Sequence, residues 1–95
     1  MAIGVIRHNV RDYVAWRKGY DDVASMQKAG GVTEESVYQA KDNPNDVLVL
    51  HRFNSLDDAE KFFASQELKE AMQRNGVEGT PRIEIFEESK RLARA

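Results

Sequence analysis

The sequence predicts an α+β domain in which four strands and two helical regions follow one another in the order β-α-β-β-α-β. Apolar residues recur at helical spacing in two segments, and capping residues precede both of them. In addition, the segment 47–53 has an apolar centre, whereas the segment 32–41 is mostly polar. This contrast is expected of a central strand beside an edge strand.

The first strand and the first helix are expected within residues 3–31. Residues 3–10 are rich in β-branched side chains and contain no proline, which favours a strand. Asp12 can cap a helix that ends at Gly30-Gly31, since glycine accepts the left-handed backbone of a helix end. Gln27 interrupts the apolar stripe of this helix near its end. The stripe consists of Tyr13, Trp16, Tyr20, Val23 and Ala24.

Two strands joined by a turn are expected next. Residues 32–41 carry Val37 and Tyr38 among polar residues, which suits an edge strand with one exposed face. Residues 42–45 are Asp-Asn-Pro-Asn, a composition typical of a turn. Residues 47–53 follow as the third strand. Its Val-Leu-Val-Leu centre shows no alternation, so both faces of this strand should be covered.

The second helical region and the last strand complete the order. Ser55 precedes a helix and resembles a capping box with Asp58, while Ser65 can cap a further helical segment that ends at Asn75-Gly76. Residues 82–88 alternate and are expected to form the fourth strand. In the last strand, Ile83 and Ile85 lie on one side and Phe86 lies on the other. The helical residues expected to face inward are Leu56, Ala59, Phe62, Phe63, Leu68, Ala71 and Met72.

This order of elements is that of the ferredoxin-like arrangement. Its strands line up as 4-1-3-2 in an antiparallel sheet, and both helical regions cover one face. The opposite face would still carry Val and Leu side chains of the first and third strands. Soluble monomers usually avoid an apolar patch of that size. We therefore expect a homodimer in which two sheets pack face to face, a dimeric α+β barrel.

Composition narrows the classes of function. The net charge is −2, and basic residues concentrate only in the segment 90–95, so we expect a domain over 1–89, a solvated charged tail, and no nucleic-acid partner. The chain has no cysteine, no paired histidines at metal-ligand spacing and no glycine-rich phosphate loop, so neither a metal nor an organic cofactor is predicted. We find no signal peptide and no apolar run near the roughly 20 residues of a membrane span, and expect a cytoplasmic protein without a membrane partner.

His8 and His51 are the candidate catalytic residues. Histidine is the side chain whose ordinary pKa suits proton transfer near neutrality, and these two lie on strands that should be neighbours. In one cavity, one of them could accept a proton while the other orients a substrate. A register slip of one residue would place them on opposite faces. The alternative interpretation of each is a hydrogen-bonded histidine in the helix layer or at a dimer interface.

Trp16 and Tyr20 share the apolar stripe of the first helix. Their rings could wall a pocket between helices and sheet and stack on a flat substrate, and the alternative interpretation is core packing. Arg52 could hold an anionic oxygen if it faces inward, although a charged residue on a strand is usually solvated.

Three segments of the chain resemble the antibiotic biosynthesis monooxygenase-like group of dimeric α+β barrels. These segments are His8-x-Val10-x-Asp12-Tyr13-x-x-Trp16, the strand Val47–Phe53, and Phe62-Phe63-Ala64-Ser65-x-Glu67-Leu68. The likeness extends from about Val5 to Phe86. The barrel superfamily that it implies includes cofactor-free monooxygenases of aromatic polyketides, haem-degrading enzymes, lactone isomerases and polyketide cyclases, so the fold does not fix the function.

The resemblance also implies a substrate site built from Asn, Trp, Tyr and Arg side chains around an aromatic ring. Haem-degrading relatives use an axial histidine on the second helical region, and this sequence has no histidine after His51, so haem chemistry of that type is not expected. The residue types of the aromatic site occur here as Asn9, Trp16, Tyr20, Tyr38 and Arg52, which are the candidate substrate-binding residues.

Two functions follow from these observations. The first is a cofactor-free monooxygenase, or a related isomerase or cyclase, that acts on a small aromatic or polyketide-like substrate between helices and sheet. The second is a non-catalytic dimeric module that binds a ligand or serves in a stress response. Both require a cavity near His8 and Trp16, and turnover separates them. A third interpretation, a purely structural dimer, predicts a filled interior.

Overall fold

The computed structural model describes residues 1–89 of the chain, so the expected tail at 90–95 lies outside the described residues. The eight elements are β1 (Ala2–Val10), α1 (Tyr13–Asp22), α2 (Ala24–Ala29), β2 (Val32–Ala40), β3 (Asn43–Phe53), α3 (Leu56–Ala64), α4 (Gln66–Arg74) and β4 (Val77–Glu87).

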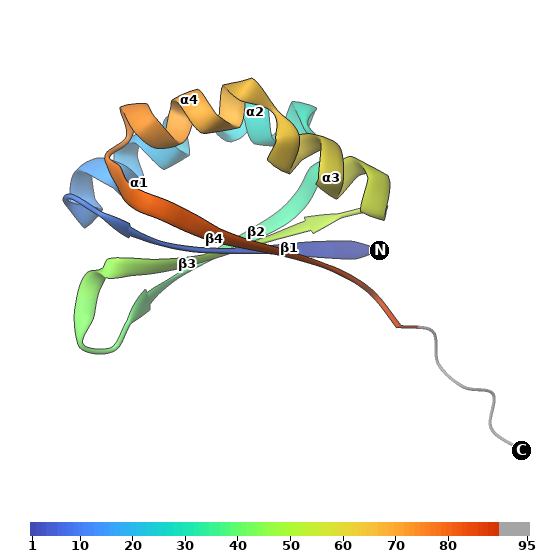
Figure 1. Cartoon of the computed structure of the whole chain (residues 1–95). Coiled ribbons are helices and arrows are strands. Elements are labelled where there is room, and N and C mark those ends of the chain that lie inside the picture. Colours follow the sequence, from blue (N-terminus) through green and yellow to red (C-terminus); the bar gives the residue numbers. More distant parts are fainter. Residues whose placement is uncertain (90–95) are drawn as a thin grey trace, which may run out of the picture.

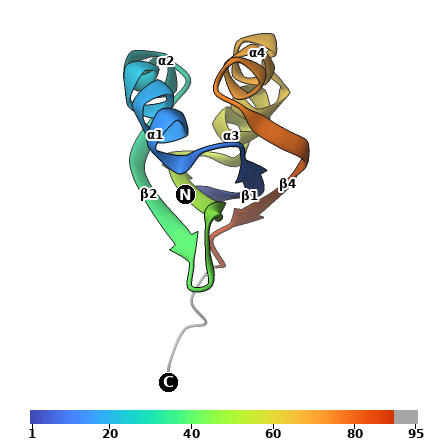
Figure 2. The same ribbon diagram turned by 90° about the vertical axis from the view of Figure 1, so that its left-hand side faces the viewer.

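The four strands form one antiparallel sheet in the order β2-β3-β1-β4. This is the predicted order 4-1-3-2 read from the other edge, so the ferredoxin-like topology is confirmed. All helices lie on one face of the sheet (Figure 1). Viewed along the sheet, α1 and α2 stand over the side of β2, and α3 and α4 stand over the side of β4 (Figure 2).

The first helical region is two helices instead of the single predicted one. The backbone leaves the helical conformation at Val23, with φ −101° and ψ 19°. This break changes which side of the following turn faces the sheet. Gln27 is consequently buried and Ala24 is exposed, the reverse of what an unbroken stripe predicts. The predicted cap is confirmed, because the Asp12 carboxylate accepts a hydrogen bond from the Ala15 amide at 3.0 Å.

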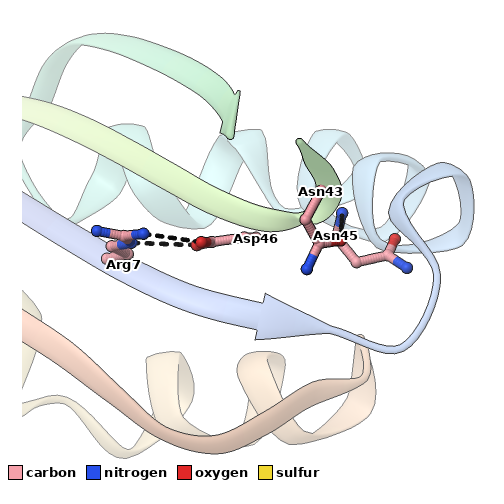
Figure 3. A network of polar contacts seen from close by, with 4 residues as sticks. All are labelled: Arg7, Asn43, Asn45 and Asp46. Atoms are coloured by element: carbon pink, nitrogen blue, oxygen red, sulfur yellow. Dashed lines mark hydrogen bonds and ion pairs between the residues drawn. The ribbon is translucent and has the colours of Figure 1, made fainter. Parts of the chain in front are cut away.

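The turn between β2 and β3 is shorter than predicted. It comprises Lys41 and Asp42, and β3 already begins at Asn43. Residues 44–46 lie in a register irregularity opposite β2, and β1 pairs only as far as Asp46, so proline at position 44 breaks no ladder hydrogen bond. The asparagines brace this end of the strand, where Asn43 and Asn45 lie next to Asp46 (Figure 3). The Asn43 side chain accepts from the backbone amide of Asn45 at 3.0 Å, and the Asn45 side chain accepts from the backbone amide of Tyr13 at 2.9 Å.

The fourth strand begins at Val77, five positions before the predicted start at 82, because β4 is an edge strand. An edge strand tolerates proline and glycine, which sequence patterns treat as breakers. Pro81 and Gly79 lie beside a register irregularity between Arg7 and Asn9 of β1, and Gly79 has φ +68°. A left-handed residue of this kind is typical of a β-bulge.

The two faces of the sheet differ sharply. The core lies between the sheet and the helices, where Val47, Val49 and Phe53 are at most 1% exposed. On the opposite face, no element of residues 1–89 lies over the sheet (Figure 1). The strand at 47–53 is therefore covered on one face within the chain, while its other face stays half-buried. We call this second surface the open face; its apolar residues are Ile3, Val5, Tyr38, Leu48, Leu50 and Phe86.

Candidate functional site

The antiparallel register brings His8 and His51 to the same face of the sheet, beneath the helices. His51 lies opposite Gly4 of β1, and His8 lies opposite Val47 of β3. His51 is 1% exposed and His8 is 7% exposed. The register question that the sequence left open is thus answered in favour of a shared interior.

Aromatic rings surround His51 on several sides. The ring centroid of Phe62 lies 5.5 Å away, and those of Phe53 and Phe63 lie 6.4 Å away. Gly4 makes room for this packing, because a Cβ built there would meet the Phe63 ring. Burial among these rings lowers the pKa of His51 to about 4, although nearby Glu35 opposes the shift. His51 is therefore a neutral imidazole at neutral pH.

Tyr20 links His51 to a carboxylate. Its hydroxyl oxygen lies 3.0 Å from Nε2 of His51 and 2.8 Å from Oε1 of Glu35. Burial, together with the Glu35 hydrogen bond, raises the pKa of Tyr20. Glu35 comes from β2, where it lies directly opposite His51 in the strand register. One residue from each of α1, β2 and β3 therefore meets at the Tyr20 hydroxyl.

The hydrogen bonds at Tyr20 determine the tautomer of His51. A phenol has one proton to donate. Tyr20 donates it to the Glu35 carboxylate, because that hydrogen bond is shorter and charge-assisted. The Tyr20 oxygen then accepts from Nε2–H of His51, which leaves Nδ1 as an unprotonated acceptor. Nδ1 of His51 is buried and has no hydrogen-bond partner among the described residues. Nδ1 is thus a buried hydrogen-bond acceptor that no described residue uses.

His8 and Trp16 lie beside this group. Their rings meet edge to face with centroids 5.5 Å apart, and Trp16 lies 4.9 Å from the Tyr20 ring. Burial lowers the pKa of His8, and its Nδ1 also lacks a partner among residues 1–89. The two histidines are thus joined through a layer of aromatic rings on α1.

A cavity of about 40 Å³ lies between α1, α4 and the sheet, and His8, Trp16, Tyr20 and His51 all line it. This is room for about one water molecule, whose share of liquid volume is ~30 Å³. Pockets for drug-sized ligands typically occupy about 300–1,000 Å³. The interior is therefore almost filled, and an aromatic ring fits only if the cavity walls move apart.

A larger, open groove runs beside β2. Its volume is about 560 Å³, and its lining includes Gln27, Lys28, Glu35 and Asn54. Gln27 also lines the interior cavity. Glu35 therefore faces the groove while it holds the Tyr20 hydroxyl, which in turn lines the cavity.

Asn9, Tyr38 and Arg52 do not join the cavity. Tyr38 lies opposite Leu48 on the open face and is 54% exposed. Arg52 lies opposite Ile3 on that same face, and its Nε is 3.4 Å from a Glu34 carboxylate oxygen. Asn9 is exposed and lies opposite Asp46. Alternation along the strands separates these side chains from the histidines, because successive residues point to opposite faces.

Glu35 and Gln27 are the site residues that the sequence pattern missed. Glu35 shares the inward side of β2 with Val37, two positions away, but that inference needs the register of β2 on β3. Gln27 turns inward only because the helix breaks at Val23. Among residues 1–89, no cluster of three His, Cys, Asp or Glu side chains suits a metal ion, and no helix in that range is long and apolar enough to span a bilayer.

Comparison with known proteins shows which solved structures have a similar fold. No protein-family model matches the chain. No curated protein matches it either. Solved structures do match it over nearly its whole length. A protein from Deinococcus radiodurans, provisionally named an antibiotic biosynthesis monooxygenase, is 14% identical, with a TM-score of 0.74, and the match covers 100% of this chain and 99% of that one.

Two further structures are similar. SnoaB from Streptomyces nogalater, a cofactor-independent oxygenase, is 13% identical with a TM-score of 0.74, over 98% of this chain and 97% of that one. A protein from Caulobacter crescentus, also provisionally named an antibiotic biosynthesis monooxygenase, is 21% identical with a TM-score of 0.68, over 94% of this chain and 91% of that one. The chain thus has the antibiotic biosynthesis monooxygenase-like fold, as its sequence segments predicted. At these identities the likeness shows the fold alone.

Proposed function

We propose that this protein is a cofactor-independent monooxygenase, or a related isomerase or cyclase, acting on a small aromatic or polyketide-like substrate between the helices and the sheet. The observation that carries the proposal is the neutral, buried His51, whose Nδ1 has no hydrogen-bond partner among the described residues, in a cavity shared with His8 and Trp16. The similar fold of SnoaB, a cofactor-independent oxygenase, supports the same class of chemistry.

The proposed chemistry begins with proton removal. Without a cofactor, the substrate itself must supply electrons to oxygen, so it must first become an electron-rich anion. Nδ1 of His51 takes a proton from an activated CH₂ group, His8 orients the neighbouring oxygen, and the Trp16 ring packs against the aromatic system. The carbanion then reduces O₂: a C–O bond forms, and the resulting hydroperoxide loses water. The balance is CH₂ plus O₂ to C=O plus H₂O.

Substrate access requires the wall between α1 and α4 to open. Gly19 of α1 and Asn75 at the end of α4 lie so close that a Cβ at position 19 would collide with the Asn75 amide. Met72, whose unbranched side chain adapts easily, lines the same wall. Separation of these two helices widens the cavity without disturbing the sheet that holds the histidines.

We also propose that the open face pairs with a second copy of the chain. Tyr38 and Phe86 expose 54% and 51% of their surface there, beside half-buried aliphatic residues. Two ion pairs neutralise charges at this face: Arg7 with Asp46 at 2.8 Å and Arg52 with Glu34 at 3.4 Å. An apolar patch bordered by internally neutralised charges suits a self-complementary, two-fold interface.

Oxygen uptake with a panel of anthrones and quinols tests the function. We expect the wild-type protein to consume oxygen with at least one of them, and His51→Ala and His8→Ala to reduce turnover by about 100-fold or more, the typical worth of a general acid–base group. Lys69→Ala, on the exposed side of α4, is the matched control and should keep full activity. Full turnover in both histidine variants would overturn the proposed roles.

The small cavity favours one alternative, a ligand-binding module without catalysis. An interior cavity of only about 40 Å³ suits a protein that widens only to hold a ligand. This alternative predicts saturable quenching of Trp16 fluorescence by the same aromatic compounds, no oxygen uptake, and unchanged binding in His51→Gln.

A further inference from the structure

A row of hydrogen bonds runs from the buried cavity to the open groove. It begins at His51, which is 1% exposed, passes through Tyr20, which is 7% exposed, and ends at Glu35, whose side chain is exposed. The two links measure 3.0 Å and 2.8 Å. His51 lines the cavity and Glu35 lines the groove, so the row leads from one to the other beside Gln27, which lines both.

We propose that His51, Tyr20 and Glu35 form a proton relay that connects the interior cavity to the groove beside β2. Its use in turnover rests on the proposed function, but the relay itself operates without a substrate. Tyr20 and Glu35 act through His51, so they are positioning residues. The sequence predicted Tyr20 as a substrate-binding residue and did not predict Glu35.

The transfer balances at each atom. A substrate C–H bond breaks, and an N–H bond forms at Nδ1 of His51. The Nε2–H proton then passes to the Tyr20 oxygen, while the former Tyr20 proton passes to the Glu35 carboxylate. Glu35 releases that proton to the solvent of the groove. Passage in reverse returns a proton to the cavity, where water leaves the hydroperoxide, and restores the first tautomer of His51.

Charged and titratable groups lie around the relay at both of its ends. The Arg17 guanidinium lies 5.3 Å from the centroid of the Tyr20 ring and is paired with Asp21 at 3.2 Å. Lys28 lines the groove together with Glu35, and His8 lines the cavity with His51. The neighbours of His51 from β3 and α3 are phenyl rings, which exchange no protons. Tyr20 is thus the polar contact of His51 among the described residues.

Glu35→Gln tests the relay with little change of shape. The glutamine oxygen still accepts from Tyr20, but it takes no proton. Glu34→Gln is the matched control, because Glu34 precedes Glu35 on the same strand and also lines the groove, but it pairs with Arg52. In the substrate-free protein, the ring Nε2–H of ¹⁵N-labelled His51 is followed by NMR, and its exchange rate with water is measured by saturation transfer.

We expect exchange to slow by about 100-fold in Glu35→Gln, within the range of general acid–base effects, and equally in Tyr20→Phe, with no change in Glu34→Gln. Unchanged exchange in Glu35→Gln would overturn the relay and leave the proposed function standing. Equal slowing in Glu34→Gln would also overturn it, because a general charge effect then explains the result. Slowed exchange without any oxygen uptake by the wild-type protein would support the relay and count against the proposed function.

Discussion

The two faces of one sheet show how the same strands serve two purposes. The face beneath the helices is closed and holds its polar groups, His8 and His51, among aromatic rings. The open face has apolar residues at its centre and paired charges beside them (Figure 3 shows the pair Arg7 and Asp46). Alternation along each strand separates the two sets completely. One set therefore forms the core and the candidate site, and the other forms the surface that we propose for association.

The largest difference between the faces is expected in the free energy of unfolding when one phenylalanine on each face is replaced by alanine. Phe53 is 0% exposed on the helix side, and Phe86 is 51% exposed on the open face. Phe53→Ala should lower the free energy of unfolding by about 3–5 kcal/mol, because it leaves a cavity in the core. Phe86→Ala should change it by about 0.5 kcal/mol or less in the monomer. Urea denaturation at low protein concentration measures both, and equal losses would contradict the comparison.

The second prediction concerns pH. The pKa of His51 is about 4 in the folded chain and has an ordinary value of 6.5. Between these values the unfolded chain binds a proton that the folded chain does not, so stability falls as pH falls from 6.5 toward 4. The loss amounts to about 3 kcal/mol from this group, at 1.36 kcal/mol for each pKa unit.

Urea midpoints at a series of pH values check this dependence. His51→Gln should reduce the dependence of stability on pH below pH 6.5, which is the ordinary pKa of histidine. A weaker dependence of stability on pH should remain in that variant, because burial also lowers the pKa of His8. An unchanged pH profile in His51→Gln would show that His51 is not held neutral by the fold.

The third prediction concerns association through the open face. Tyr38→Lys places a charge within the proposed interface and should weaken self-association by about 1.4–2.8 kcal/mol, or roughly 10- to 100-fold in Kd. Val14→Lys is the control, since Val14 is 75% exposed on α1, on the helix side. Sedimentation velocity over a range of concentrations separates the two. Equal behaviour of both variants would remove the open face as the interface.

The smallest effect is expected for the ion pair of Arg7 and Asp46. The guanidinium donates two hydrogen bonds to the carboxylate, at 3.1 Å and 2.8 Å, and this contact raises the pKa of Arg7 and lowers that of Asp46. Because the Arg7 side chain is 61% exposed, salt and water screen the pair. Asp46→Asn should barely shift the thermal midpoint at 0.15 M salt, as should Glu84→Gln at the neighbouring Arg82 pair. A marked loss in Asp46→Asn alone would show that this pair braces the β3 end.

Local signals predicted most of the elements. Asp12, Ser55 and Ser65 cap their helices as expected, because the hydrogen bond of a cap involves residues only three positions apart. The sequence predictions were wrong where the structure depends on contacts with residues that are distant in the sequence. Pro81 and Gly79 are accepted because β4 is an edge strand, and the break at Val23 turns Gln27 inward toward the cavity.

By itself, the sequence determined the order of elements, the ferredoxin-like topology and the candidate residues His8, His51, Trp16 and Tyr20, because periodicity and capping are local properties of the chain. Only the tertiary structure decided that these four share one cavity, that Glu35 joins them, and that Asn9, Tyr38 and Arg52 lie elsewhere. The reason is strand register. Shifting a strand by one residue exchanges its two faces, and register is fixed by contacts between residues that are distant in sequence.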